Sequence, residues 1–172
     1  MMVNGIPRWT CRTQSSRIHK KKQMKIAPLR NFPIIKDLVV DMDVFFEKWT
    51  TAGTFQSNST EITKFAQVEP QSSNRTAADS AIECIGCGVC YAACDVVRWK
   101  PNYLGPAALN RGWSLYNDVR YEHPDRLLRS LTSNSGCLSC HTTQSCSKFC
   151  PKELDPSASI AGLKSKSVRV PF

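Results

Sequence analysis

The sequence predicts a mostly helical fold in which cysteine-bearing loops are held between short helices. Several segments carry apolar residues at helical spacing, and three of them open with a proline suited to a first helical turn. Eight of the nine cysteines fall into two short runs, at residues 84–94 and 137–150. A chain of 172 residues with 41% apolar content is long enough for one ordinary domain or two small ones.

The first predicted helix covers residues 34–51, where apolar residues recur at helical spacing until the pattern ends near Gly53. Residues 53–80 are polar with little periodicity, which predicts a surface loop or linker. The sequence therefore divides into three predicted regions: 1–33, 34–80 and 81–172.

Three further helices are predicted in the last region, and each begins at a proline, namely Pro106, Pro124 and Pro156. The helix after Pro106 places apolar and aromatic residues on one face. Asp155 is the predicted N-cap of the last helix. The cysteine runs are thus predicted to be loops and short turns, with metal clusters replacing much of the core.

Composition narrows the class of protein. No stretch approaches the roughly 18 consecutive apolar residues that span a membrane, and no signal peptide is expected. The net charge of +9 comes from the N-terminal segment, because nine of the 23 lysines and arginines precede Asp37, the first acidic residue. By itself, such a basic segment fits a transit peptide, a nucleic-acid-binding arm or a solvated loop.

The cysteine count raises three possibilities: disulfides, zinc or iron-sulfur clusters. Disulfide frameworks belong mostly to small secreted domains, and an odd number of cysteines without a signal peptide argues against one. We therefore expect reduced thiols and a cytosol-like compartment. Zinc sites usually take two ligands from each of two separated knuckles, which a run of four closely spaced cysteines does not fit.

The first run has the spacing C-x2-C-x2-C-x3-C, formed by Cys84, Cys87, Cys90 and Cys94. This is the bacterial ferredoxin pattern, in which three cysteines hold one cluster and the fourth holds the other. It predicts a bacterial-type dicluster ferredoxin domain, with short loops around two iron-sulfur clusters.

The second run departs from this pattern. Cys140, Cys146 and Cys150 precede Pro151, and Thr143 stands where the middle cysteine would be. A hydroxyl is a poor iron ligand beside thiolates, so one corner of that cluster lacks an anchor and a three-iron cluster is expected.

The crossover rule assigns the seven ligands. Cys84, Cys87, Cys90 and Cys150 are predicted to hold a [4Fe-4S] cluster, and Cys94, Cys140 and Cys146 a [3Fe-4S] cluster. Cys137 is then spare and is expected to be a buried or half-buried free thiol. An alternative in which the C-L-S-C motif makes Cys137 a ligand fits the register less well.

These residues resemble a known family. The stretch from Cys84 to Lys164, with "YLGPAAL" and "CPKELDP", is similar to the C-terminal half of the iron-sulfur subunit of succinate dehydrogenase and fumarate reductase. "NGIPRWTCRT" and "LRNFPIIKDLVVDMDVFFEKW" resemble the segment that joins the two domains of that subunit. The resemblance disfavours the transit peptide and the nucleic-acid arm.

The same resemblance implies that residues 1–33 are the remnant of a plant-type [2Fe-2S] ferredoxin domain and a basic connector. In the family, the cysteine at the position of Cys11 is the fourth ligand of the [2Fe-2S] cluster, and the other three would precede Met1. We therefore expect a fragment, a misplaced start or a split subunit. Cys11 binds no cluster unless another chain supplies the missing ligands.

The family's function is electron relay between a flavoprotein subunit and quinone at a membrane anchor. The resemblance therefore implies an electron-transfer subunit of a succinate:quinone oxidoreductase, peripheral to the cytoplasmic face of the bacterial inner membrane or to the matrix face of the mitochondrial one. It implies quinone contacts by Trp99, His141 and Lys164. No succinate chemistry is expected on this chain.

Two other classes remain open from the sequence. One is a dicluster ferredoxin of another respiratory complex, of heterodisulfide-reductase or glycerol-phosphate dehydrogenase type. The other is a protein without electron transfer, either a zinc-binding module or a defective remnant.

Overall fold

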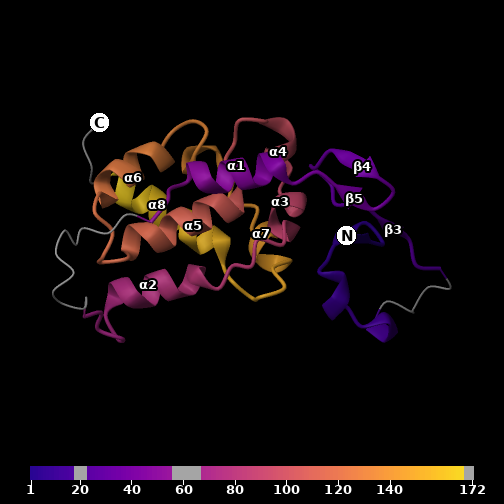
Figure 1. Ribbon diagram of the computed structural model, residues 1–172, viewed down its shortest axis with the longest axis horizontal. Helices are drawn as coiled ribbons and strands as arrows, with labels where there is room; N and C mark the ends of the chain where they lie inside the picture. Colours follow the sequence, from indigo (N-terminus) through magenta and orange to yellow (C-terminus); the bar gives the residue numbers. More distant parts are fainter. Residues whose placement is uncertain (18–22, 56–66, 169–172) are drawn as a thin grey trace.

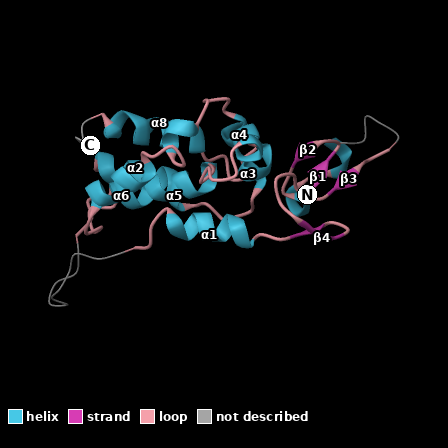
Figure 2. Cartoon of the chain, turned by 90° about the horizontal axis from the view of Figure 1, so that it is seen from above, coloured by secondary structure: helices cyan, strands magenta, loops and turns pink. Residues whose placement is uncertain are grey.

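The computed structural model describes residues 1–17, 23–55 and 67–168. A helical part and a smaller β part near the N-terminus lie side by side (Figure 1), and the view from above separates them in the same way (Figure 2). The mostly helical fold is thereby confirmed. The helices are α1 Asp43–Thr51, α2 Ser73–Ile82, α3 Val89–Ala93, α4 Asp95–Trp99, α5 Pro106–Asn117, α6 Pro124–Leu131, α7 Ser145–Lys148 and α8 Pro156–Ser167.

Within the residues that the structure describes, the β part contains two small antiparallel sheets. The first has the order β2-β1-β3 and the second is a two-stranded hairpin of β4 and β5. An Asn4–Gly5 turn joins the first two strands, and both residues have positive φ angles, of 50° and 78°. The strands are β1 Met2–Val3, β2 Ile6–Pro7, β3 Ile26–Ala27, β4 Ile34–Lys36 and β5 Val39–Val40. The described part of the chain also contains the 3-10 helices η1 Thr10–Arg12, η2 Ser15–Arg17 and η3 Cys137–Ser139.

The predicted helix over residues 34–51 is wrong in its first part. Residues 34–40 form the β4–β5 hairpin, and only Asp43–Thr51 is helical. The β-branched residues there favour strands. Asp37 makes the turn at φ 49°, in the left-handed region that aspartate tolerates better than most residues.

The loop predicted for residues 53–80 is also wrong in its last part, because α2 begins at Ser73. The Ser72 hydroxyl accepts a hydrogen bond from the Arg75 amide at 3.2 Å and caps this helix. Two alanines, Ala78 and Ala81, are buried where α2 packs on α5. Residues 56–66 of the predicted linker, and residues 18–22 of the basic segment, lie outside the described residues.

The centre of the helical part is α5, which contacts α1, α2, α6 and α8. Its Leu109 and Asn110 are fully buried. The Asn110 amide donates to the Ala81 carbonyl at 3.1 Å and accepts from the Ser159 hydroxyl at 2.9 Å. One polar side chain therefore ties α2 and α8 to α5. The helices predicted at Pro106, Pro124 and Pro156 are confirmed as α5, α6 and α8.

The N-cap of α8 also agrees with its prediction. The Asp155 carboxylate accepts hydrogen bonds from the Ala158 amide at 3.0 Å, the Ser157 hydroxyl at 2.6 Å and the Ser147 hydroxyl. The Ser147 bond first, and then the Ser157 bond, lower the pKa of Asp155 below its usual value. The cap thereby joins α8 to the turn that carries Cys146.

We expect Asp155→Ala to lower the free energy of unfolding by about 1 kcal/mol, whereas Asp155→Asn retains a capping oxygen and loses less. Since the folded pKa lies below the unfolded value of about 3.9, the carboxylate's contribution is fully present above that pH and is lost only as pH falls through the folded pKa. The loss on Asp155→Ala should therefore be equal at pH 5.5 and pH 8 when thermal unfolding of the variant and of the unchanged protein is compared. A loss that changes across this range would contradict the lowered pKa.

Candidate metal centres

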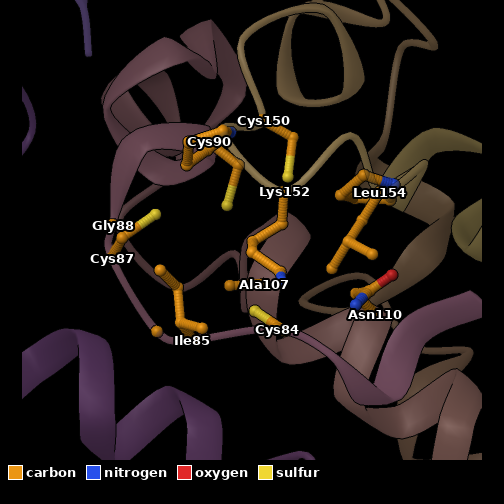
Figure 3. A pocket seen from close by; sticks show the side chains of 13 residues that line it. Cys84, Ile85, Cys87, Gly88, Cys90, Ala107, Asn110, Cys150, Lys152 and Leu154 are labelled. Carbon is orange, nitrogen blue, oxygen red and sulfur yellow. The ribbon is translucent and has the colours of Figure 1, made fainter. Parts of the chain in front are cut away.

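Four thiols gather at one pocket, although one of them is more than 50 residues away in the sequence. Cys84, Cys87 and Cys90 come from the first run and Cys150 from the end of the second, and all four line the pocket. Figure 3 shows their sulfur atoms directed toward a shared space. Cys94, the fourth cysteine of the first run, is not among the lining residues. We refer to this arrangement as the four-thiol site.

Two glycines shape the loop around the four-thiol site. Gly86 and Gly88 have φ angles of 64° and 73°, which bend the backbone around the sulfurs. Burial, the largest cause, raises the pKa values of Cys84 and Cys87, and the backbone at Gly86 and Val89, respectively, lowers them by a smaller amount. At Gly88 a Cβ atom would lie 2.9 Å from the Phe32 ring, so a side chain is excluded by space as well as by φ.

The four-thiol site disfavours free thiolates. Burial is the largest cause that raises the pKa values of Cys84, Cys87 and Cys90, and charge on the neighbouring sulfurs raises them further. The pKa of Cys90 is raised the most, because this thiol is buried beside the other three. Deprotonated sulfurs packed this way need positive charge among them, which bound metal supplies.

In a second group of thiols, Cys94 of the first run lies near two cysteines of the second run. Cys94 stands before α4, Cys140 follows η3, and Cys146 lies in α7. The pKa of Cys146 is raised to about 11, mainly by burial and then by charge on Cys94 and Cys140. Charge on Cys140 also raises the pKa of Cys94, where burial is again the largest cause. We call these three residues the three-thiol site.

The N-terminal part of the chain supports the loop between the two sites. The Asn31 side-chain amide donates to the Tyr91 carbonyl at 2.9 Å and to the Cys94 carbonyl at 3.0 Å. These carbonyls lie at the end of α3, where backbone carbonyls have no hydrogen-bond donor within the helix. Asn31 has a φ angle of 67°, which an asparagine adopts more readily than most residues.

The three residues implied to contact quinone lie in different surroundings. The Lys164 ammonium donates to the Cys140 carbonyl at 2.7 Å, so its charge lies beside the three-thiol site. His141 is exposed and directly follows Cys140. Trp99 ends α4 with 69% of its surface exposed. The structure thus brings two of the three to the Cys140 segment.

Three other residues singled out by the sequence analysis are also described by the structure. Thr143 is exposed in the loop between Cys140 and α7. Cys137 is a fully buried free thiol. Cys11 is an exposed free thiol in η1, within the β part.

Sequence reasoning missed one residue at the three-thiol site, Tyr103. Its side chain is 1% exposed, and its pKa is raised first by burial and then by charge on Cys140, Cys94 and Cys146. No spacing rule links a tyrosine in "NYLGP" to a cysteine 37 positions later, so the sequence carried no signal for this placement.

The chemistry of the two sites suits iron-sulfur clusters. The metal-ligating side chains that gather there are cysteines, and soft thiolate sets select iron-sulfur clusters or zinc. Among the described residues, no three histidine, cysteine or acidic side chains are placed to hold a single metal ion. The groups of four and three thiols fit a four-iron and a three-iron cluster. The single thiol of Cys11 does not fit a [2Fe-2S] cluster.

Comparison with protein families gives two matches. Residues 1–47 match the family described as a 2Fe-2S iron-sulfur cluster binding domain. Residues 83–155 match the 4Fe-4S dicluster domain, which contains both cysteine runs.

Curated relatives match nearly the whole chain. It is 35% identical over 166 residues to the fumarate reductase iron-sulfur subunit of Escherichia coli O6:H1, covering 93% of this chain and 65% of that protein. It is 32% identical over 180 residues to the subunit of the same name from Haemophilus influenzae, covering 98% of this chain and 70% of that one. The chain thus spans about two thirds of the length of these relatives.

A solved structure has the same fold. One chain of the "Mycobacterium smegmatis Sdh1 complex in the apo form" superposes with a TM-score of 0.85 at 24% identity. The match covers 97% of this chain and 70% of that chain.

Proposed function

Because this chain belongs to the family of fumarate reductase and succinate dehydrogenase iron-sulfur subunits, we propose that it is the electron-transfer subunit of a succinate:quinone oxidoreductase. It relays electrons between a flavoprotein subunit and membrane quinone. The observation that carries this proposal is the exchange of cysteines between runs, which makes one group of four thiols and one of three. Two adjacent redox sites in one domain are what a relay requires.

The seven cysteines hold the two clusters in this proposal. Cys84, Cys87, Cys90 and Cys150 hold a [4Fe-4S] cluster, and Cys94, Cys140 and Cys146 hold a [3Fe-4S] cluster. Each bound cluster supplies a one-electron store. The chain's own contribution is to place the two sites close together. Charge on Cys146, from the three-thiol site, is one of the causes that raise the pKa of Cys90 in the four-thiol site.

Quinone binds beside the three-thiol site in the same proposal. The Trp99 indole N–H is a donor that suits a quinone carbonyl, and its exposure leaves it accessible to a partner. His141 and the Lys164 ammonium stabilise negative charge on reduced quinone. The hydrogen bond from Lys164 to the Cys140 carbonyl fixes that positive charge at the cluster loop.

The partners follow from the relay. A flavoprotein subunit exchanges electrons with this chain, and one or more membrane anchor subunits hold quinone. None of the helices in residues 1–17, 23–55 and 67–168 is both long and apolar enough to cross a membrane. In this proposal the chain is a peripheral subunit, attached through its anchor to the cytoplasmic face of a bacterial inner membrane, with the mitochondrial matrix face as the alternative.

The test is anaerobic purification of the tagged chain from its native host. We expect about seven iron atoms per chain, a similar amount of acid-labile sulfide, and co-purification of a flavoprotein and a membrane anchor. Cys137→Ala is the matched control, because this buried cysteine lies outside both thiol groups, and it should leave the iron content unchanged. Abundant zinc without sulfide would overturn the proposal. Recovery of a soluble partner alone would favour a ferredoxin of another respiratory complex.

A further inference from the structure

At the three-thiol site, both backbone polar groups of Cys94 are engaged in hydrogen bonds. Its amide donates to the Tyr91 carbonyl at 3.3 Å, and its carbonyl accepts from the Asn31 side-chain amide at 3.0 Å. The same Asn31 amide donates to the Tyr91 carbonyl at 2.9 Å. An asparagine side chain has two N–H hydrogens. Asn31 therefore holds the Cys94 carbonyl directly and also holds the carbonyl to which the Cys94 amide donates.

Cys140 is held in a similar way. Its amide donates to the Cys137 carbonyl at 3.1 Å, and its carbonyl accepts from the Lys164 ammonium at 2.7 Å. The third cysteine of the site, Cys146, lies inside α7. Two of the three cysteines are thus fixed by a side chain that comes from a segment far away in the sequence.

The four-thiol site has a different arrangement. Within the described part of the chain, no side chain donates a hydrogen bond to the backbone carbonyl of Cys84, Cys87, Cys90 or Cys150. A cluster with four thiolate ligands keeps three when one of them moves away, whereas a cluster with three keeps only two. The position of each cysteine therefore matters more at the three-thiol site.

Asn31 reaches α3 from a backbone that is itself fixed. Its φ angle of 67° lies in the left-handed region, which turns the chain just before Phe32. Phe32 is buried, and its ring packs against the Tyr91 ring of α3 with the centroids 5.0 Å apart. The direction of the Asn31 amide is therefore set by the packing of the N-terminal part on α3.

Side chains that orient a metal ligand without touching the metal contribute to metal binding, and their removal typically weakens it by about 10–100-fold. Asn31 acts on the backbone of Cys94 and not on its sulfur. Without the amide, the Cys94 carbonyl at the end of α3 has no side-chain donor, and the residue is freer to turn away from Cys140 and Cys146.

We propose that Asn31 is a positioning residue for the three-thiol site, where it fixes the backbone of Cys94 and so keeps this cysteine at its cluster. The inference rests on the cluster assignment proposed above. A side chain of the N-terminal part thereby controls how firmly one of the two clusters is retained.

The experiment measures cluster retention in Asn31→Gly, in the complex purified anaerobically with its partners. Glycine adopts the left-handed backbone without strain, so the change removes the amide and keeps the turn. The three-iron EPR signal of the oxidised complex is followed over time with an iron chelator present. We expect this signal to decay about tenfold faster than in the wild type. The four-iron signal, followed in the same preparation after reduction, should keep its wild-type lifetime.

Asn4→Gly is the matched control. Asn4 also has a positive φ angle, of 50°, and its side-chain oxygen accepts from the Lys25 amide at 2.9 Å within the β part. This variant loses the same side chain from the same part of the protein but leaves the hydrogen bonds to α3 in place. Both signals should keep their wild-type lifetimes.

Two results would overturn the inference and leave the proposed function intact. One is an Asn31→Gly complex whose three-iron signal decays at the wild-type rate. The other is equally faster decay of both signals, because Asn31 would then stabilise the contact between the two parts of the chain in general. Wild-type complex without a three-iron signal would instead overturn the cluster assignment.

Asn31→Asp is the second test if Asn31→Gly fails to assemble. Aspartate has the size of asparagine and tolerates the same backbone angle, but its carboxylate has no hydrogen to donate. This variant should lose the three-iron signal faster and retain the four-iron signal. Failure of both variants to assemble, while Asn4→Gly assembles, would overturn the inference, because an effect confined to one site leaves the rest of the fold in place.

Discussion

Cys150→Ala is expected to convert the four-iron cluster into a three-iron one, so that the oxidised protein gains a second three-iron EPR signal beside the one it already has. Cys150 lies in the second run by sequence, yet its sulfur lines the pocket with Cys84, Cys87 and Cys90. Without it, one corner of that site has no thiolate ligand. Three thiolates remain there, as at the three-thiol site, so we expect the iron content to fall from about seven to about six atoms per chain.

Cys94→Ala is the reciprocal change and should remove the three-iron cluster. Cys94 belongs to the first run, but the charges that raise its pKa include that of Cys140. The three-iron EPR signal should therefore vanish while about four iron atoms remain. Iron analysis and EPR of both variants, beside Cys137→Ala as the control, make the measurement. Loss of the four-iron cluster in Cys94→Ala, with retention in Cys150→Ala, would mean that the cysteines group by run and that the crossover is wrong.

The helices that the sequence predicted well are those with a start signal in the chain itself. Pro106, Pro124 and Pro156 each stand at the first turn of an observed helix. The prediction that the cysteine runs are loops and short turns between helices is only partly right. The first run contains the short helix α3, and the second contains η3 and α7.

The errors fell where local pattern and tertiary context disagree. In residues 34–40 the spacing of the β-branched residues fits a helix and a strand equally well. The segment forms a hairpin because the chain turns at Asp37. In α2 the sequence is polar, and the helix is secured by its Ser72 cap and by burial of two alanines on α5. A short stretch of sequence does not reveal such packing against a distant helix.

At the candidate sites, too, the sequence pattern predicted some features and missed those that depend on tertiary contacts. Spacing predicted the two groups of thiols, and Cys84, Cys87, Cys90 and Cys150 line one pocket in the structure. It did not predict that Tyr103 is buried beside the three-thiol site or that the Asn31 amide donates to the Cys94 carbonyl. Both placements bring together segments far apart in the chain, and neither residue type has a ligand spacing that a sequence pattern expresses.

Thr143→Cys is expected to convert the three-iron cluster into a four-iron one. Thr143 occupies the position of the missing middle cysteine, in the loop that leads from Cys140 to Cys146. A thiolate there supplies the ligand that the fourth iron lacks. The EPR signal of the oxidised three-iron cluster should disappear, and the iron content should rise from about seven to about eight atoms per chain.

Thr142→Cys is the matched control for this change, because it places a thiol in the same exposed loop one position away. Thr142 and Gln144 both have a φ angle of 59°, so the backbone turns on each side of Thr143 and the three side chains have different directions. A fourth iron needs a ligand at one corner of the cluster, and a thiol displaced by one residue does not reach that corner. Thr142→Cys should therefore retain the three-iron signal. If Thr142→Cys loses that signal and Thr143→Cys keeps it, the register of the second run is wrong, and with it the reason for a three-iron site next to quinone.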